Sequence, residues 1–214
     1  MEGGGSDSFI LGDIGSYTQT ENVWPILFAC LICLDAVIGL ARFAGLGGYS
    51  LNAFFDLFGL EAVISISSHT IMLLLITQWA YTTFYMVGER RWSPFVFICF
   101  ALFLQSLHDL FWNFVLLSNV PSGKNDMIDM AKKYAQENGS RAFVGHSVLL
   151  VFVCVIAMFL KETSQLFTVI VVAIGAGLLP LMLSSVGPKP PPPPPPPEKK
   201  KTIEDNWNGN RFQM

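Results

Sequence analysis

Ionisable side chains stand inside stretches of the sequence that are otherwise apolar. Asp35 lies within the apolar run 24–44, and His69 lies within a second run, 61–87. In a third run, 95–118, polar residues recur at intervals of three and four: Gln105, His108, Asp109, Trp112 and Asn113. That spacing places them on one face of a helix. An ionisable group at the centre of a bilayer costs at least about 2.5 kcal/mol, so these residues are candidates for function.

Lipid cannot solvate such a polar stripe, so we expect it to face other helices, with Asp35 and His69 as its partners. Our first interpretation is packing, because interhelical hydrogen bonds worth about 0.6–2 kcal/mol each would fix the order of the helices. A second interpretation is a proton or ion path with Asp35, Asp109, His69 and His108 as relay sites, although the broken helices and repeated halves of many transporters are not evident. A third is haem or metal ligation by His69 and His108.

No catalytic pattern accompanies these residues. Intramembrane hydrolysis would need a nucleophile with its base or a zinc motif such as H-E-x-x-H, and the sequence contains neither pattern. We therefore predict no enzyme, no metal site and no cofactor. Cys30 and Cys33 lie in the middle of an apolar run, which predicts packing rather than redox chemistry.

The composition predicts an all-α integral membrane helical bundle. Of 214 residues, 52% are hydrophobic and 14% charged, and the mean hydropathy is +0.49. A bilayer is crossed by about 20 apolar residues, which predicts about five transmembrane helices at 24–44, 61–87, 95–118, 142–160 and 166–185. Little chain remains for a soluble catalytic domain. The net charge of -3 and the pI near 5.5 exclude nucleic acid as a partner.

Three parts are predicted along the chain: an acidic flexible N-terminal segment (1–23) without a signal peptide, a transmembrane domain (24–186) and a C-terminal tail (187–214). Segment 49–58 is too short to cross a membrane and should lie at its interface. Aromatic residues near the end of the second span predict an interfacial belt: Trp79, Tyr81, Tyr85 and Trp92.

The polar loop between the third and fourth spans predicts an amphipathic helix over about 124–139. Asn125 can cap its start and Gly139 can end it. Its charges cancel, so contact with protein fits this helix at least as well as adsorption to anionic lipid. One face carries the expected partner-docking residues Met127, Ile128, Ala131 and Tyr134.

The tail contains an uninterrupted proline run from Pro190 to Pro197. In polyproline II conformation it would form a spacer of roughly 25 Å at about 3.1 Å per residue. Beyond it, Ile203, Trp207 and Phe212 stand among polar residues and are candidate anchors, since aromatic residues dominate interface hot spots. An alternative interpretation is recruitment of SH3-type partners by the prolines.

Lys and Arg predict the orientation. With five spans, three of these residues fall on the N-terminal side and ten on the other side. The positive-inside rule therefore predicts that the amphipathic loop helix and the tail share the cytosolic face.

Residues His108 to Ser147 read HDLFWNFVLLSNVPSGKNDMIDMAKKYAQENGSRAFVGHS. This stretch resembles a group of multi-span membrane proteins of large icosahedral DNA viruses of the chlorovirus and giant-virus kind. The resemblance implies a virion inner-membrane protein, in particular a minor capsid protein, in a membrane derived from host endomembrane. It implies no site residue.

We therefore expect a structural protein that tethers a protein shell to a bilayer through the loop helix and the tail, with capsid or other shell proteins as partners. A homo-oligomer is compatible with this expectation. The leading alternative is a small transporter or proton-conducting protein that uses the intramembrane Asp and His residues.

Overall fold

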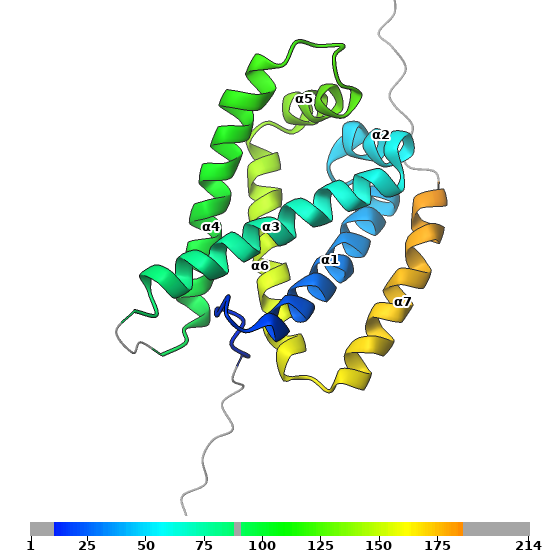
Figure 1. Cartoon of the computed structure of the whole chain (residues 1–214). Helices are drawn as coiled ribbons and strands as arrows, with labels where there is room; N and C mark the ends of the chain where they lie inside the picture. The colour runs from blue at the N-terminus through cyan, green and yellow to red at the C-terminus, as the bar shows by residue number, and fades with distance from the viewer. Residues whose placement is uncertain (1–10, 88–90, 186–214) are drawn as a thin grey trace, which may run out of the picture.

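The computed structural model describes residues 11–87 and 91–185, and within these ranges the chain is an all-α bundle (Figure 1). Five helical segments are long and apolar enough to cross a membrane, as predicted. They are α1 (Val23–Ala44), α3 (Leu60–Phe84), α4 (Pro94–Phe111) with the π-helical turn η2 (Trp112–Leu117), α6 (Ser140–Glu162) and α7 (Gln165–Ser184). The remaining elements are η1 (Thr20–Asn22), α2 (Gly48–Phe58) and α5 (Asp126–Asn138).

The predicted tail residues lie outside the described residues. These are the spacer residues Pro190 and Pro197 and the candidate anchors Ile203, Trp207 and Phe212.

Local signals set several helix ends. The Ser93 side chain accepts a hydrogen bond from the Val96 amide, and Pro94 occupies the first turn of α4. The Asn125 side chain accepts from the Ile128 amide and caps α5, as predicted. Gly139 then separates α5 from α6, so the predicted loop helix is confirmed with nearly the predicted bounds.

The helix α1 is the centre of the bundle. It packs against α6 and α3, and α7 contacts it from the outside (Figure 1). The helix α4 packs against α3 and α6, away from α7. Cys30, Cys33 and Cys154 are buried in the apolar core as free thiols.

One end of the bundle, called the α5 end below, carries α2 and α5 (Figure 1). Glu137 of α5 accepts hydrogen bonds from the Tyr49 and Ser50 amides at 2.8 and 2.7 Å and from the Ser50 hydroxyl. Asn138 Nδ2 donates to the Gly47 carbonyl at 3.0 Å. The start of α2 is therefore capped by a side chain of α5, 87 residues further along the chain.

Arg42 ties α7 to the same end. Its side chain is fully buried, and it pairs with Asp56 of α2 and also donates to the Leu183 carbonyl. The last turn of α7 therefore lies beside α2, although the two elements are far apart in the sequence.

The expectation of a flexible N-terminal segment is wrong for residues 11–22. Ile14 is completely buried, and its carbonyl accepts a hydrogen bond from Gln78 Nε2 at 2.6 Å. The carbonyls of Leu11 and Gly15 accept from Trp92 Nε1 and Thr82 Oγ1 at 3.0 and 2.9 Å. Polar side chains from the helix ends thus satisfy the backbone of an extended segment, which fills the end of the bundle opposite α5.

Tyr81 is likewise not part of an interfacial belt. It is completely buried, its hydroxyl accepts a hydrogen bond from the Ser93 amide at 2.9 Å, and its ring contacts Trp92 and Phe97. The prediction failed because the N-terminal segment covers this side chain. Trp79, by contrast, is exposed on the outside of α3.

Candidate functional site

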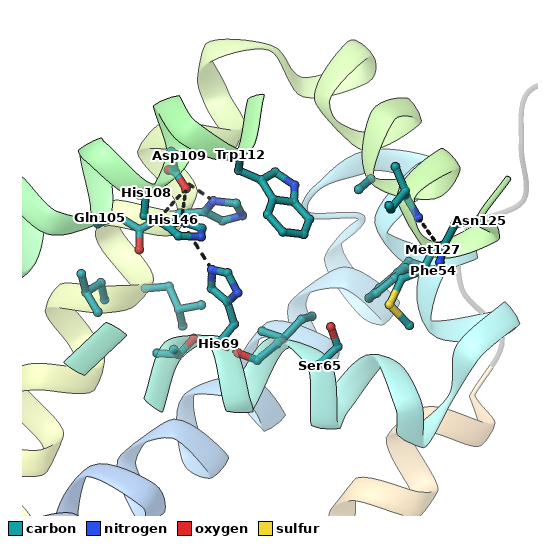
Figure 2. A pocket seen from close by; sticks show the side chains of 16 residues that line it. Phe54, Ser65, His69, Gln105, His108, Asp109, Trp112, Asn125, Met127 and His146 are labelled. Atoms are coloured by element: carbon teal, nitrogen blue, oxygen red, sulfur yellow. Dashed lines mark hydrogen bonds and ion pairs between the residues drawn. The ribbon is translucent and has the colours of Figure 1, made fainter. Parts of the chain in front are cut away.

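All three histidines of the chain meet around one carboxylate. His69 comes from α3, His108 and Asp109 from α4, and His146 from α6 (Figure 2). Asp109 lies eight residues before Leu117, where its span ends. This is about 12 Å along a helix axis. The group therefore lies within the bundle, in the half nearer the α5 end.

The four side chains form a connected series (Figure 2). His69 Nε2 lies 3.4 Å from His108 Nδ1, which in turn lies 3.4 Å from Asp109 Oδ1. His146 Nδ1 lies 3.6 Å from Asp109 Oδ2. A neutral imidazole has one N–H and one acceptor nitrogen, so His108 Nδ1 can donate to only one of its two neighbours. Movement of one proton consequently changes the bonding of the whole series.

Asp109 is only partly satisfied by protein hydrogen bonds. Gln105 Nε2 donates to Oδ1 at 2.7 Å, and Asn113 Nδ2 donates to the Asp109 backbone carbonyl at 2.8 Å. The residue is 8% exposed, and its buried Oδ2 has no hydrogen-bond partner in the described structure. An unpaired buried carboxylate oxygen is costly, and the nearest group that can offset this cost is a protonated His146.

Directly beside these groups the span changes from α-helix to π-helix. The α-helical part of this span ends at Phe111, and the π-helical turn η2 begins at Trp112. The Trp112 ring stacks on His108 and meets His69 edge-on, with centroids 6.2 and 6.0 Å apart. Single π-helical turns are rare and are frequent at functional sites.

The polar groups line a cavity of about 300 Å³, called the histidine cavity below (Figure 2). Residues of α3, α4, η2 and α6 form its walls, and α5 covers it together with Phe54 of α2. Its lining is Phe54, Ser65, Ile66, His69, Thr70, Gln105, His108, Asp109, Trp112, Asn125, Met127, Ile128, Ala131, His146, Leu149 and Leu150.

The predicted docking face of α5 is turned toward the chain itself. Met127, Ile128 and Ala131 line the histidine cavity, and Tyr134 stacks on His146 with ring centroids 6.2 Å apart. These residues are half-buried in the isolated chain. Burial, and secondarily the Glu137 carboxylate, raises the pKa of the Tyr134 phenol. The apolar face of α5 therefore has an intramolecular contact.

The structure brings together most of the predicted polar residues. His69 contacts His108 of the stripe of α4, as expected. Within the stripe, Gln105 donates to the Asp109 carboxylate and Asn113 to the Asp109 backbone carbonyl, where the sequence predicted partners on other helices. The expectation for Asp35 is wrong, because its carboxylate faces α7, where a Cβ on Gly175 would lie 2.6 Å from Oδ2. The physical reason is topological, since α3 and α6 pack between α1 and α4.

His146 was not predicted as a site residue. It stands alone near the start of a span, and no polar residue recurs beside it at helical spacing. The available signal was that the chain has only three histidines and that each of them lies within an apolar run.

A haem or metal at these histidines finds no support in the geometry. The rings of His69 and His108 are in direct contact, with centroids 4.1 Å apart, which leaves no space for a haem between them. Within residues 11–87 and 91–185, no group of three or more His, Cys, Asp and Glu side chains could hold a metal ion.

Comparison of the chain with known protein families, with curated proteins and with solved structures gives no match.

Proposed function

We propose that the chain is a small membrane transporter that carries protons across the bilayer, with the histidine cavity as its acid–base site. The observation that carries the proposal is the convergence of three histidines and one carboxylate, from three different spans, on a single cavity. Ionisable residues that face a cavity inside a membrane protein are typical of proton relays and substrate sites.

Packing alone gives a poorer account of this arrangement. Polar groups that only fix helix order are expected to satisfy one another across the helix interfaces. Here the contacts across the helix interfaces are long, 3.4 Å between His69 and His108 and 3.6 Å between His146 and Asp109 Oδ2, and Oδ2 has no hydrogen-bond partner among the described residues. A group that binds and releases a proton needs such incomplete bonding, because its two protonation states must differ little in free energy.

A carrier is favoured over an open channel. Buried apolar side chains of Leu74, Phe97 and Ala101 lie in the core beyond the cavity. Residues 11–22 then fill the end opposite α5. This arrangement suits a state loaded from the α5 end and closed at the other end.

Proton movement into liposomes that contain the full chain and an internal pH dye tests the proposal. Under an imposed pH step and membrane potential, we expect proton entry above that of protein-free liposomes. Asp109→Asn should reduce it to the protein-free rate. Asp35→Asn is the matched control, because it removes an intramembrane carboxylate outside the cavity and should retain the flux. Equal proton entry in wild type and Asp109→Asn would overturn the proposal.

A second proposed function is the tether between a bilayer and a protein shell, in a virion inner membrane. The supporting observation is that α7 ends at the α5 end, where Arg42 binds both Asp56 and the Leu183 carbonyl. The last described turn of α7 thus lies on the face that carries α2 and α5. A Trp207→Ala/Phe212→Ala double variant should lose binding to a purified shell protein, while a Gly/Ser chain of equal reach in place of Pro190–Pro197 should only weaken it. Retained binding by the double variant would refute the tether.

A further inference from the structure

The chemistry of the histidine cavity indicates the class of molecule that it binds. Its volume of about 300 Å³ is at the lower end of the range for small-molecule sites. The polar groups converge from α3, α4 and α6, while the opposing surface is apolar and aromatic. On the α2 and α5 side it is formed by Phe54, Met127, Ile128 and Ala131, with Asn125 as the polar residue among them. A ligand with one polar end and one apolar end matches this division.

The charge of the lining favours a cationic polar end. Asp109 is the single acidic residue of the lining, and no Lys or Arg belongs to it. With neutral histidines the cavity therefore carries one negative charge. Within the described part of the chain, the carboxylate oxygen Oδ2 has no hydrogen-bond partner, and His146 Nδ1 lies 3.6 Å from it. The face of Trp112 adds to the preference, since an indole ring attracts cations.

Protons compete with such a cation. Among the described residues, the titratable groups near Asp109 are His108 on its own helix, His69 on α3 and His146 on α6. Tyr134 of α5 stacks on His146. When His108 or His146 is protonated it pairs with Asp109, and the cavity is neutral. An ammonium group that takes Oδ2 therefore releases one proton from a histidine to water, and the total charge of the site is unchanged.

We propose that the histidine cavity binds an amphipathic primary amine, whose ammonium group takes the place of a protonated histidine at Asp109 and so displaces one proton to water. This inference rests on the proposed function, because it uses the same cavity as a proton-binding site. It adds the class of ligand and the direction of coupling: affinity for the amine falls as the pH falls. The amine is either a free solute or the headgroup of an amino lipid, since both present the same ammonium group.

Three probes of similar size and different charge test the proposal: 2-phenylethylammonium, neutral 2-phenylethanol and anionic 3-phenylpropionate. Binding is measured by calorimetry on the full chain in phosphatidylcholine nanodiscs, with empty nanodiscs subtracted. We expect the ammonium to bind at least about tenfold more tightly than either analogue, as one charge-assisted hydrogen bond predicts. Its affinity should fall as the pH is lowered from 8 to 5.

Variants locate the binding. Asp109→Asn should weaken the ammonium at least about tenfold, while Asp35→Asn should leave the affinity within twofold. Ala131→Phe keeps Asp109 but fills the cavity from α5, and it should also abolish binding. Circular dichroism establishes that each variant is folded. Nanodiscs with phosphatidylethanolamine form a further arm: a lower apparent affinity for the probe identifies the lipid amine as a competing ligand, and an equal affinity identifies a free amine.

Equal affinity for the ammonium and the alcohol would overturn the inference, as would an affinity that rises when the pH falls. These outcomes are separate from the failure of the proposed function. Proton flux without amine binding refutes the ligand class alone, and amine binding without Asp109-dependent flux refutes the transporter.

Discussion

Glu137 holds the cover of the histidine cavity in place, and its substitution gives the sharpest test of the fold. Its carboxylate accepts hydrogen bonds from the Tyr49 and Ser50 amides and from the Ser50 hydroxyl. Gly48 is adapted to this contact: its φ is +73°, and a Cβ there would lie 2.2 Å from Glu137 Oε1. Among the described residues, Glu137 is the acidic side chain that caps the start of α2, and Glu137→Ala removes it.

The expected loss of free energy on Glu137→Ala depends on how far water reaches this contact. Hydrogen bonds to a charged group are worth about 1.5–3 kcal/mol each when water cannot replace them. Tyr49 is 46% exposed, so water can reach its amide after the substitution. The value for an ordinary helix cap, about 1–2 kcal/mol, is therefore the better guide. We expect Glu137→Ala to lower the free energy of opening α5 away from α2 by that amount.

Hydrogen–deuterium exchange of the full chain in detergent measures this opening. A loss of 1–2 kcal/mol makes exchange of the α5 amides roughly 5–30 times faster. The cavity below should become more accessible, so the histidines should react faster with diethyl pyrocarbonate. Gln136→Ala, at the exposed neighbouring position, is the control and should change neither rate. Unchanged exchange across Asp126–Asn138 in Glu137→Ala would refute the conclusion that Glu137 holds α5 against α2.

Three further predictions concern other parts of the bundle. Gly15→Ala would place a Cβ 2.5 Å from the Trp92 ring, so the thermal unfolding midpoint should drop by an amount equivalent to about 1–3 kcal/mol; an unchanged midpoint would show that residues 11–22 do not pack as described. Asp56→Ala leaves the buried Arg42 guanidinium with the Leu183 carbonyl alone and should destabilise the chain by about 1–2 kcal/mol in chemical denaturation, because Asp56 itself is largely exposed. Burial raises the pKa of the Tyr134 phenol. The contribution of this residue to stability is therefore complete below its pKa in the unfolded chain, near 10, and is lost as the pH rises through its pKa in the folded chain. The difference in absorbance at 295 nm between wild type and Tyr134→Phe should appear only at a pH above the range in which an exposed tyrosine ionises.

The spans could be predicted because their determinants are local. Length and apolar composition define each span, and residues such as Asn125 and Gly139 mark the helix ends regardless of what packs beside them. The contact of His69 with the stripe of α4 was also predictable, because successive antiparallel spans are joined by a short turn.

The misplaced residues depend on non-local packing. Asp35 could be assigned to the stripe or to another neighbour of α1, because one helix has several faces and the sequence does not specify which helix covers which face. Residues 11–22 are polar and rich in glycine, so they have the composition of a flexible segment. Their order depends on donors 64 to 81 residues away, namely Gln78, Thr82 and Trp92.

The amphipathic face of α5 illustrates the same limit and bears directly on function. An apolar stripe on a polar helix indicates that another surface covers it. The stripe does not indicate whether that surface belongs to the same chain or to a partner. Here Met127, Ile128 and Ala131 face the histidine cavity, so the stripe that predicted a partner forms the wall of a site instead. The helix α5 is bonded to α2 through Glu137 and Asn138 and to the loop before it through Asp129 and Lys132. Because these polar contacts are few and α5 is polar on its other face, we expect it to open more readily than the spans. A cover of this kind gives a ligand entry to the cavity from the α5 end while the five spans stay packed.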